Sequence, residues 1–68
     1  MRFKELITLV DGTENVVVNA AENVMLYRGK AKDYSALEKF YECEISLIGV
    51  SVYEELIITL KVDDSEFV

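Results

Sequence analysis

Hydrophobic residues recur with a helical period in one stretch of the chain, residues 33–42. Its apolar positions are Tyr34, Leu37, Phe40 and Tyr41. Tyr34, Leu37 and Tyr41 stand at i, i+3 and i+7, so they share one face of a helix. Asp33 is a favourable N-cap, because its carboxylate can accept hydrogen bonds from the free amides of the first turn. The pattern predicts one short helix with an aromatic-rich face toward the core.

Most of the remaining chain alternates between apolar and polar residues, which is typical of strands. Strands are predicted for residues 3–10, 16–18, 24–28, 43–52 and 56–62. The first should pair with the second through a turn at residues 11–15, whereas residues 19–23 are expected to form a loop or weak helix. Gly49 and residues 50–55 suggest a bulge or a wide hairpin connection. The last strand alternates most regularly and is predicted to be central.

This order of elements predicts an α+β domain. A small, mostly antiparallel sheet of four to five strands should pack against one short helix, in the order ββ(β)αββ. Residues 1–68 should form a single domain, with residues 63–68 as a frayed acidic tail. The hydrophobic content of 51% is high for a chain of 68 residues. It indicates a dense core or apolar surface covered by a partner, so a homodimer is one alternative.

The charge of the chain favours a basic protein partner. Thirteen acidic and seven basic residues give a net charge of −6, which repels nucleic acid and anionic membranes. We therefore expect no direct nucleic-acid or membrane partner. The candidate partner-binding residues are Glu38, Glu42, Glu44, Glu54, Glu55, Asp63, Asp64 and Glu66. The alternative is that the negative charge only keeps an apolar small protein soluble.

One cluster of basic residues has two interpretations. Arg28, Lys30 and Lys32 follow one another at a spacing of two, which directs them to one side of an extended chain. A phosphate site would need a glycine-rich cradle, and Gly29 has no neighbouring glycine. A charged strand edge that blocks aggregation is the interpretation we prefer. The acidic turn at residues 11–15 has too few spaced oxygen ligands to predict calcium binding.

Catalytic chemistry is not predicted for this sequence. It contains no histidine, which removes the commonest general base near neutral pH and a frequent metal ligand. The adjacent pairs Glu54-Glu55 and Asp63-Asp64 would point to opposite faces of a strand. Cys43 is the single cysteine and is expected to be a small buried hydrophobe, which fits a cytoplasmic protein. We expect no signal peptide, catalytic residue, cofactor or metal, and we predict a non-enzyme.

The stretch Val24-Met25-Leu26-Tyr27-Arg28-Gly29-Lys30-Ala31-Lys32-Asp33 resembles a segment of small uncharacterised proteins from Gram-positive phages and mobile elements. In those proteins a strand ending in Leu-Tyr-x-Gly-Lys leads into a short helix and then a hairpin. The resemblance covers about two-thirds of the chain. It implies a small, acidic, intracellular class that includes anti-CRISPR proteins and other inhibitors of nucleic-acid-binding sites. It implies no individual site residues.

Three hypotheses follow. The first is an inhibitor of phage or mobile-element type whose acidic surface occupies a basic nucleic-acid-binding surface, such as that of a CRISPR nuclease. The second is a homo-oligomeric structural or assembly protein, suggested by the hydrophobic content. The third is a minimal enzyme or metal protein that uses Asp63, Asp64 and Glu66.

Overall fold

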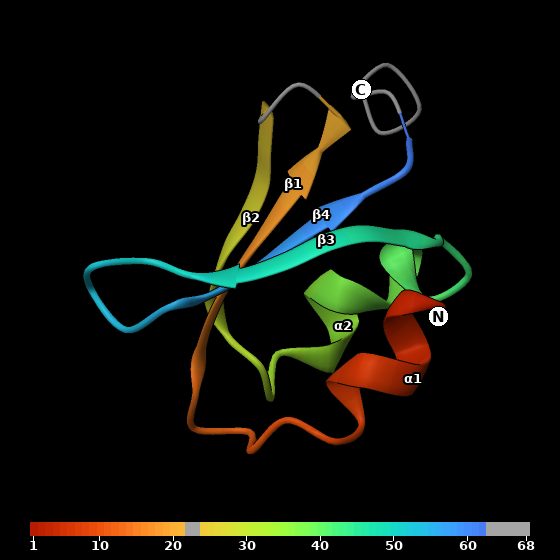
Figure 1. Ribbon diagram of the computed structural model, residues 1–68. Helices are drawn as coiled ribbons and strands as arrows, with labels where there is room; N and C mark the ends of the chain where they lie inside the picture. The colour runs from red at the N-terminus through yellow and green to blue at the C-terminus, as the bar shows by residue number, and fades with distance from the viewer. Residues whose placement is uncertain (22–23, 63–68) are drawn as a thin grey trace.

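The computed structural model describes residues 1–21 and 24–62, and the acidic tail predicted at residues 63–68 lies outside the described residues. Figure 1 shows a twisted sheet with both helices below its strands. The elements are α1 (Phe3–Ile7), β1 (Asn15–Ala20), β2 (Val24–Lys30), α2 (Tyr34–Leu37) with a 3-10 turn η2 (Glu38–Phe40), β3 (Ile45–Val50) and β4 (Leu56–Leu60).

The sheet has the strand order β2-β1-β4-β3. The two outer pairings, β1 with β2 and β3 with β4, are antiparallel, and the central strands β1 and β4 run parallel. The predicted α+β class and the order ββαββ are confirmed, as is the central position of the last strand. The outer strands β2 and β3 are the two edges of this sheet.

The core lies between one face of the sheet and the helices. Its sheet side includes Val16 and Val18 of β1 and Ile58 and Leu60 of β4, which alternate with residues of the opposite face. Its helix side comprises Phe3, Ile7, Leu37 and Phe40. The rings of Phe3 and Phe40 meet edge to face with their centroids 5.8 Å apart, which is a favourable aromatic geometry.

The prediction of a strand at residues 3–10 is wrong. Residues Phe3–Ile7 form α1, and Phe3 and Ile7 are buried because positions i and i+4 share one helix face. Leu9, which a strand would have placed beside Ile7, is 78% exposed. The Arg2 amide donates to Glu5 Oε1 at 3.0 Å and stabilises the first turn. Strand β1 pairs with β2 and β4 rather than with this segment.

The predicted helix at residues 33–42 is correctly placed but shorter and partly 3-10. Asp33 is the N-cap residue, but its side chain caps no amide; its Oδ1 accepts from Ser35 Oγ at 3.2 Å. The amides of Ala36 and Leu37 donate to the Asp33 carbonyl instead. Tyr34 is largely exposed, so the aromatic face contacts the core only through its later residues.

Two strand details also differ from the prediction. Strand β1 continues to Ala20, within the segment expected to be a loop. The register shift of β3 lies between Ile45 and Leu47, not at Gly49. Because of this shift, Ile45 pairs with buried Leu60 while Leu47 pairs with Thr59 of the opposite face. Ile45 and Leu47 therefore do not share the face that simple alternation predicts.

Candidate functional site: an open strand edge

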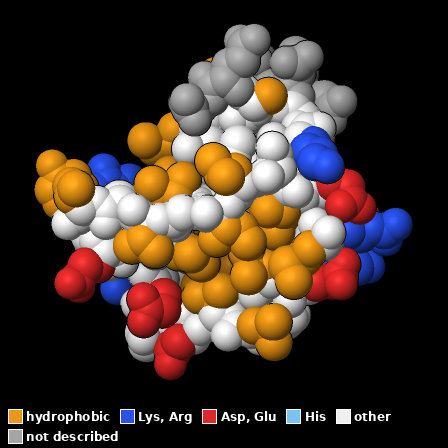
Figure 2. All heavy atoms as spheres, viewed as in Figure 1, with side chains coloured by type: hydrophobic (Ala, Val, Ile, Leu, Met, Phe, Trp, Pro, Cys, Tyr) orange, Lys and Arg blue, Asp and Glu red, His pale blue; other side chains and the backbone are white. Residues whose placement is uncertain are grey.

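Strand β3 is an exposed apolar edge of the sheet. The exposed fractions of Leu47, Ile48 and Val50 are 66%, 46% and 71%. Its six residues carry no charge, whereas the opposite edge, β2, carries Arg28 and Lys30. Charged side chains on an edge strand hinder pairing with other chains, so only β2 has this protection. Figure 2 shows hydrophobic side chains gathered where β3 runs above α2.

The N-terminus covers the beginning of the β3 edge. The amide of Ile45 donates to the Met1 carbonyl at 2.9 Å, and Arg2 forms an antiparallel bridge with Glu44. Among the described residues, the open part of the edge therefore starts after Ile45 and extends to Val50.

The hydrogen-bonding pattern shows which backbone groups are open. At the end of β3, the Ser51 amide donates to the Glu55 carbonyl at 2.9 Å. In an antiparallel ladder the hydrogen-bonded pairs alternate, so Gly49 bonds to Ile57 and the intervening residues face outward. Ile48 and Val50 therefore direct their amides and carbonyls away from β4. These groups can form hydrogen bonds with an additional strand.

The connection between β3 and β4 is a fixed hairpin that extends away from the helices (Figure 1). The Ser51 hydroxyl accepts from the amides of Tyr53 at 3.1 Å and Glu55 at 3.2 Å. Glu54 has a φ of 62°, an uncommon backbone conformation for a residue other than glycine. Val52 and Tyr53 are exposed on this hairpin and extend the apolar edge.

An ion pair on the sheet face opposite the helices ties this hairpin to β2. Arg28 Nε lies 2.7 Å from Glu55 Oε2, and the Glu55 side chain is only 11% exposed. This hydrogen bond raises the pKa of Arg28. The pair adjoins a shallow hollow of about 300 Å³ between Val17 and Ile57 of the central strands. Glu55 is therefore part of the fold and is not available to a partner as a surface carboxylate.

Two other predicted acidic residues are engaged by cations of the same chain. Glu42 accepts from Arg2 Nη1 at 2.9 Å and Lys4 Nζ at 2.8 Å. Glu44 lies 3.4 Å from the Met1 amine and 3.8 Å from Arg2 Nε. The hydrogen bond from Lys4 is the largest cause of the lowered pKa of Glu42. These cations reduce the negative field that a basic partner would meet here.

The described candidate carboxylates form two groups at opposite ends of β3. Glu38, Glu42 and Glu44 lie before the strand, and Glu54 and Glu55 lie in the hairpin after it. Glu38 and Glu54 are exposed. Asp63, Asp64 and Glu66 lie outside the described residues.

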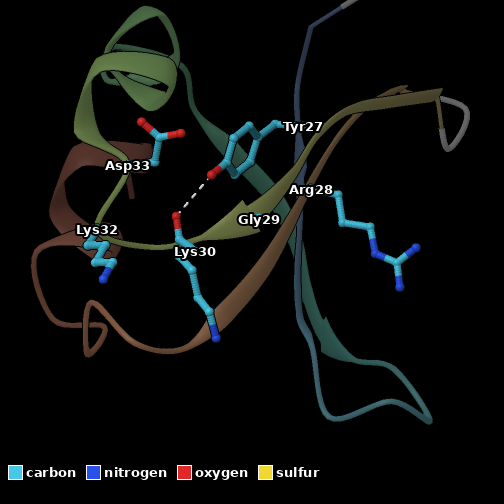
Figure 3. A pocket seen from close by; sticks show the side chains of 6 residues that line it. All are labelled: Tyr27, Arg28, Gly29, Lys30, Lys32 and Asp33. Carbon is cyan, nitrogen blue, oxygen red and sulfur yellow. Dashed lines mark hydrogen bonds between the residues drawn. The ribbon is translucent and has the colours of Figure 1, made fainter.

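The basic residues 28, 30 and 32 lie on and just beyond the edge strand β2, around a hollow of about 550 Å³ (Figure 3). Lys30 Nζ donates to the Thr13 carbonyl at 3.0 Å, and Arg28 is held by Glu55. Tyr27 lies along the strand and donates to the Lys30 carbonyl at 3.0 Å. Burial raises the pKa of Tyr27, with a further contribution from Asp33. Two of the three cations thus have internal partners, which fits a charged edge better than a phosphate site.

Other kinds of site find little support in the part of the chain that is described. Within residues 1–21 and 24–62 no three acidic or cysteine side chains converge as metal ligands. Asp11 Oδ1 accepts from the Thr13 amide and hydroxyl at 2.9 and 2.7 Å, which lowers the pKa of Asp11 and closes the turn. No described helix has the length and apolar character needed to cross a bilayer.

Comparisons with protein-family models, curated proteins and solved structures find no match to this chain. The feature that the sequence prediction missed is the β3 edge. Its signal is the run Ile45-Ser46-Leu47-Ile48-Gly49-Val50, which contains neither charge nor proline.

Proposed function

We propose that this protein is a non-catalytic binding module that adds a strand of a protein partner to the edge of β3. The observation that carries the proposal is the combination of outward backbone groups at Ile48 and Val50 with exposed apolar side chains on an uncharged edge. In this mode of recognition, main-chain hydrogen bonds supply affinity, and alternate side chains supply specificity.

The energetics favour an apolar strand as the partner. Complete burial of an exposed leucine, isoleucine or valine contributes about 1.5–3 kcal/mol. Leu47, Ile48 and Val50 offer three such side chains, of which Ile48 is already half-buried. Part of this gain is offset by the ordering of the partner strand. A charged partner strand would gain little here, because β3 offers it no opposite charge.

A site-specific photo-cross-linker tests the location of the binding surface. We expect benzoylphenylalanine at Ile48 of the full chain to form protein adducts in host cells. The same group at Met25, an exposed residue on the protected β2 edge, is the matched control and should form few. Equal adducts at both positions, or none at Ile48, would contradict the proposal.

A second candidate function is the inhibitor of phage or mobile-element type, related in strategy to anti-CRISPR proteins. The net charge of −6 favours it, and so does the exposure of Glu38 and Glu54 at the two ends of β3. In this version the module acts in the cytoplasm and covers a basic, nucleic-acid-binding surface of a defence nuclease.

Charge reversal tests this second function if Glu55 is left unchanged, because that residue holds Arg28 within the fold. The double variant Glu38→Lys/Glu54→Lys should lower the association rate with a basic partner and weaken its salt dependence. Unchanged inhibition by this variant would count against an acidic docking surface.

A further inference from the structure

We infer that the strand added to β3 is β3 of a second copy, paired antiparallel about a two-fold axis at Ile48. This inference rests on the proposed function and names its partner. A two-fold dimer joins the same surface of both copies, so the surface must be complementary to itself. The geometry of β3 meets that requirement with Ile48 on the axis.

The backbone allows two registers, and the side chains decide between them. With the axis at Gly49, Ile48 pairs with Val50 but Leu47 lies opposite Ser51; with the axis at Ile48, Leu47 lies opposite Gly49. Ile48 and Val50 face outward, so Ile48 can exchange hydrogen bonds with Ile48 of the second copy, and Val50 then lies opposite Ser46, the extra residue at the register shift. A register centred on Leu47 would place Val50 opposite Glu44. The backbone of Glu44 already pairs with Arg2 on that side of the strand. The Ile48-centred register uses only the open segment 46–50.

Side chains are also complementary in this register. Leu47 of one copy lies opposite Gly49 of the other, and the space above Gly49 is empty to at least 4 Å from where a Cβ would stand. The exposed Leu47 side chain can therefore lie over Gly49 of the second copy. Ile48 meets Ile48 on the helix side of the extended sheet. No charged residue faces another within the paired segment, which matters because each copy carries a net charge of −6.

The length of the open edge implies a weak dimer. Stable interfaces bury about 1,200–2,000 Å² in total, which exceeds what two five-residue segments provide. In this register Val52 of one hairpin reaches the level of Glu44 of the second copy, where Arg2 already pairs, so the hairpin can extend the contact only against the N-terminal segment with its exposed Met1. We therefore expect a reversible dimer with a dissociation constant of roughly 10 µM to 1 mM.

Sedimentation equilibrium of the full chain across this concentration range tests the inference. The wild type should dissociate reversibly from twice the chain mass. Ile48→Lys and Ile48→Glu should each weaken the dimer at least ~10-fold, because like charges directly opposite in a ladder repel. An equimolar mixture of the two variants should dimerise again, since lysine and glutamate then meet at the axis. Met25→Lys, the matched control on β2, should dimerise as the wild type does.

The outcomes separate this inference from the proposed function. A wild type that stays monomeric at millimolar concentration overturns the homodimer. Cross-links from Ile48 to a different protein would still support strand addition. A dimer that Ile48→Lys leaves intact would place the contact elsewhere and overturn the register. If the Ile48 variants prove too unstable to fold, Val50→Lys tests the same contact, because Val50 is more exposed and its substitution should disturb the fold less. It should also weaken the dimer.

Discussion

At the scale of single residues, Gly29 and Gly49 occupy comparable strand positions with different surroundings. A Cβ at Gly29 would stand 2.5 Å from the Tyr27 hydroxyl, whereas a Cβ at Gly49 meets nothing within 4 Å. Gly29→Ala should therefore displace the Tyr27 ring from the Lys30 carbonyl and destabilise the fold by about 1–3 kcal/mol. Gly49→Ala, measured in dilute monomer, should be neutral or stabilise by up to about 1 kcal/mol. Urea unfolding compares the two; similar losses would contradict this account of Gly29.

The ion pairs of Glu42 predict a dependence of stability on pH. Its contact with Lys4 lowers its pKa below the ordinary 4.5, so the carboxylate stabilises the fold when charged. This contribution is complete above the ordinary value and is lost as the pH falls through the lower pKa of the folded state. The free energy of unfolding should thus differ between wild type and Glu42→Gln at pH 7, and the difference should vanish in acid. Glu38→Gln, an exposed carboxylate outside these pairs, is the control; a pH-independent difference would contradict the assignment.

At the scale of elements, the first segment shows how two periods can coexist in a short sequence. Phe3, Ile7 and Leu9 fit a strand, but Phe3, Leu6, Ile7 and Val10 stand at i, i+3, i+4 and i+7, which fits a helix better. The structure follows the second pattern, with all four contributing to the core. The later strands were predictable because β-branched runs alternate there without a competing helical set.

This difference predicts a large effect for one substitution in this segment and a small effect for its neighbour. Of Ile7 and Leu9 only Ile7 is buried, so Ile7→Ala should destabilise the fold by about 2–5 kcal/mol. Leu9→Ala removes an exposed side chain and should change stability by less than about 0.5 kcal/mol. A strand would bury both residues and give two large losses. Denaturant midpoints of the two variants decide between these arrangements.

The candidate site was less predictable than the fold because it depends on contacts distant in sequence. Acidic residues could be counted, but their pairing with Arg2, Lys4 and Arg28 follows from the tertiary arrangement. The identity of β3 as an edge likewise depends on strand order, which alternation does not specify. Its lack of charge was visible in the sequence, but that feature is equally compatible with a central strand.

At the scale of the whole molecule, the two sheet edges are chemically different. Strand β2 carries Arg28 and Lys30, whereas β3 is uncharged and open beyond its first residue. The described candidate carboxylates come before and after β3 in the chain, and none lies within the strand. A partner can therefore approach β3 by strand pairing without meeting a charge, although the net charge of the molecule still acts at long range.

This long-range charge predicts the effect of salt and separates the two proposed modes of binding. Two copies that each carry a net charge of −6 repel each other. Self-association through β3 should therefore strengthen as the salt concentration rises from about 20 to 300 mM, because the Debye length shortens. Docking of an acidic surface on a basic partner should weaken over the same range. Sedimentation equilibrium at several salt concentrations measures the first effect, and Met25→Lys, which reduces the net charge away from β3, should make it smaller. A homodimer that weakens with added salt would show that attraction between opposite charges, not the uncharged edge, holds the copies together.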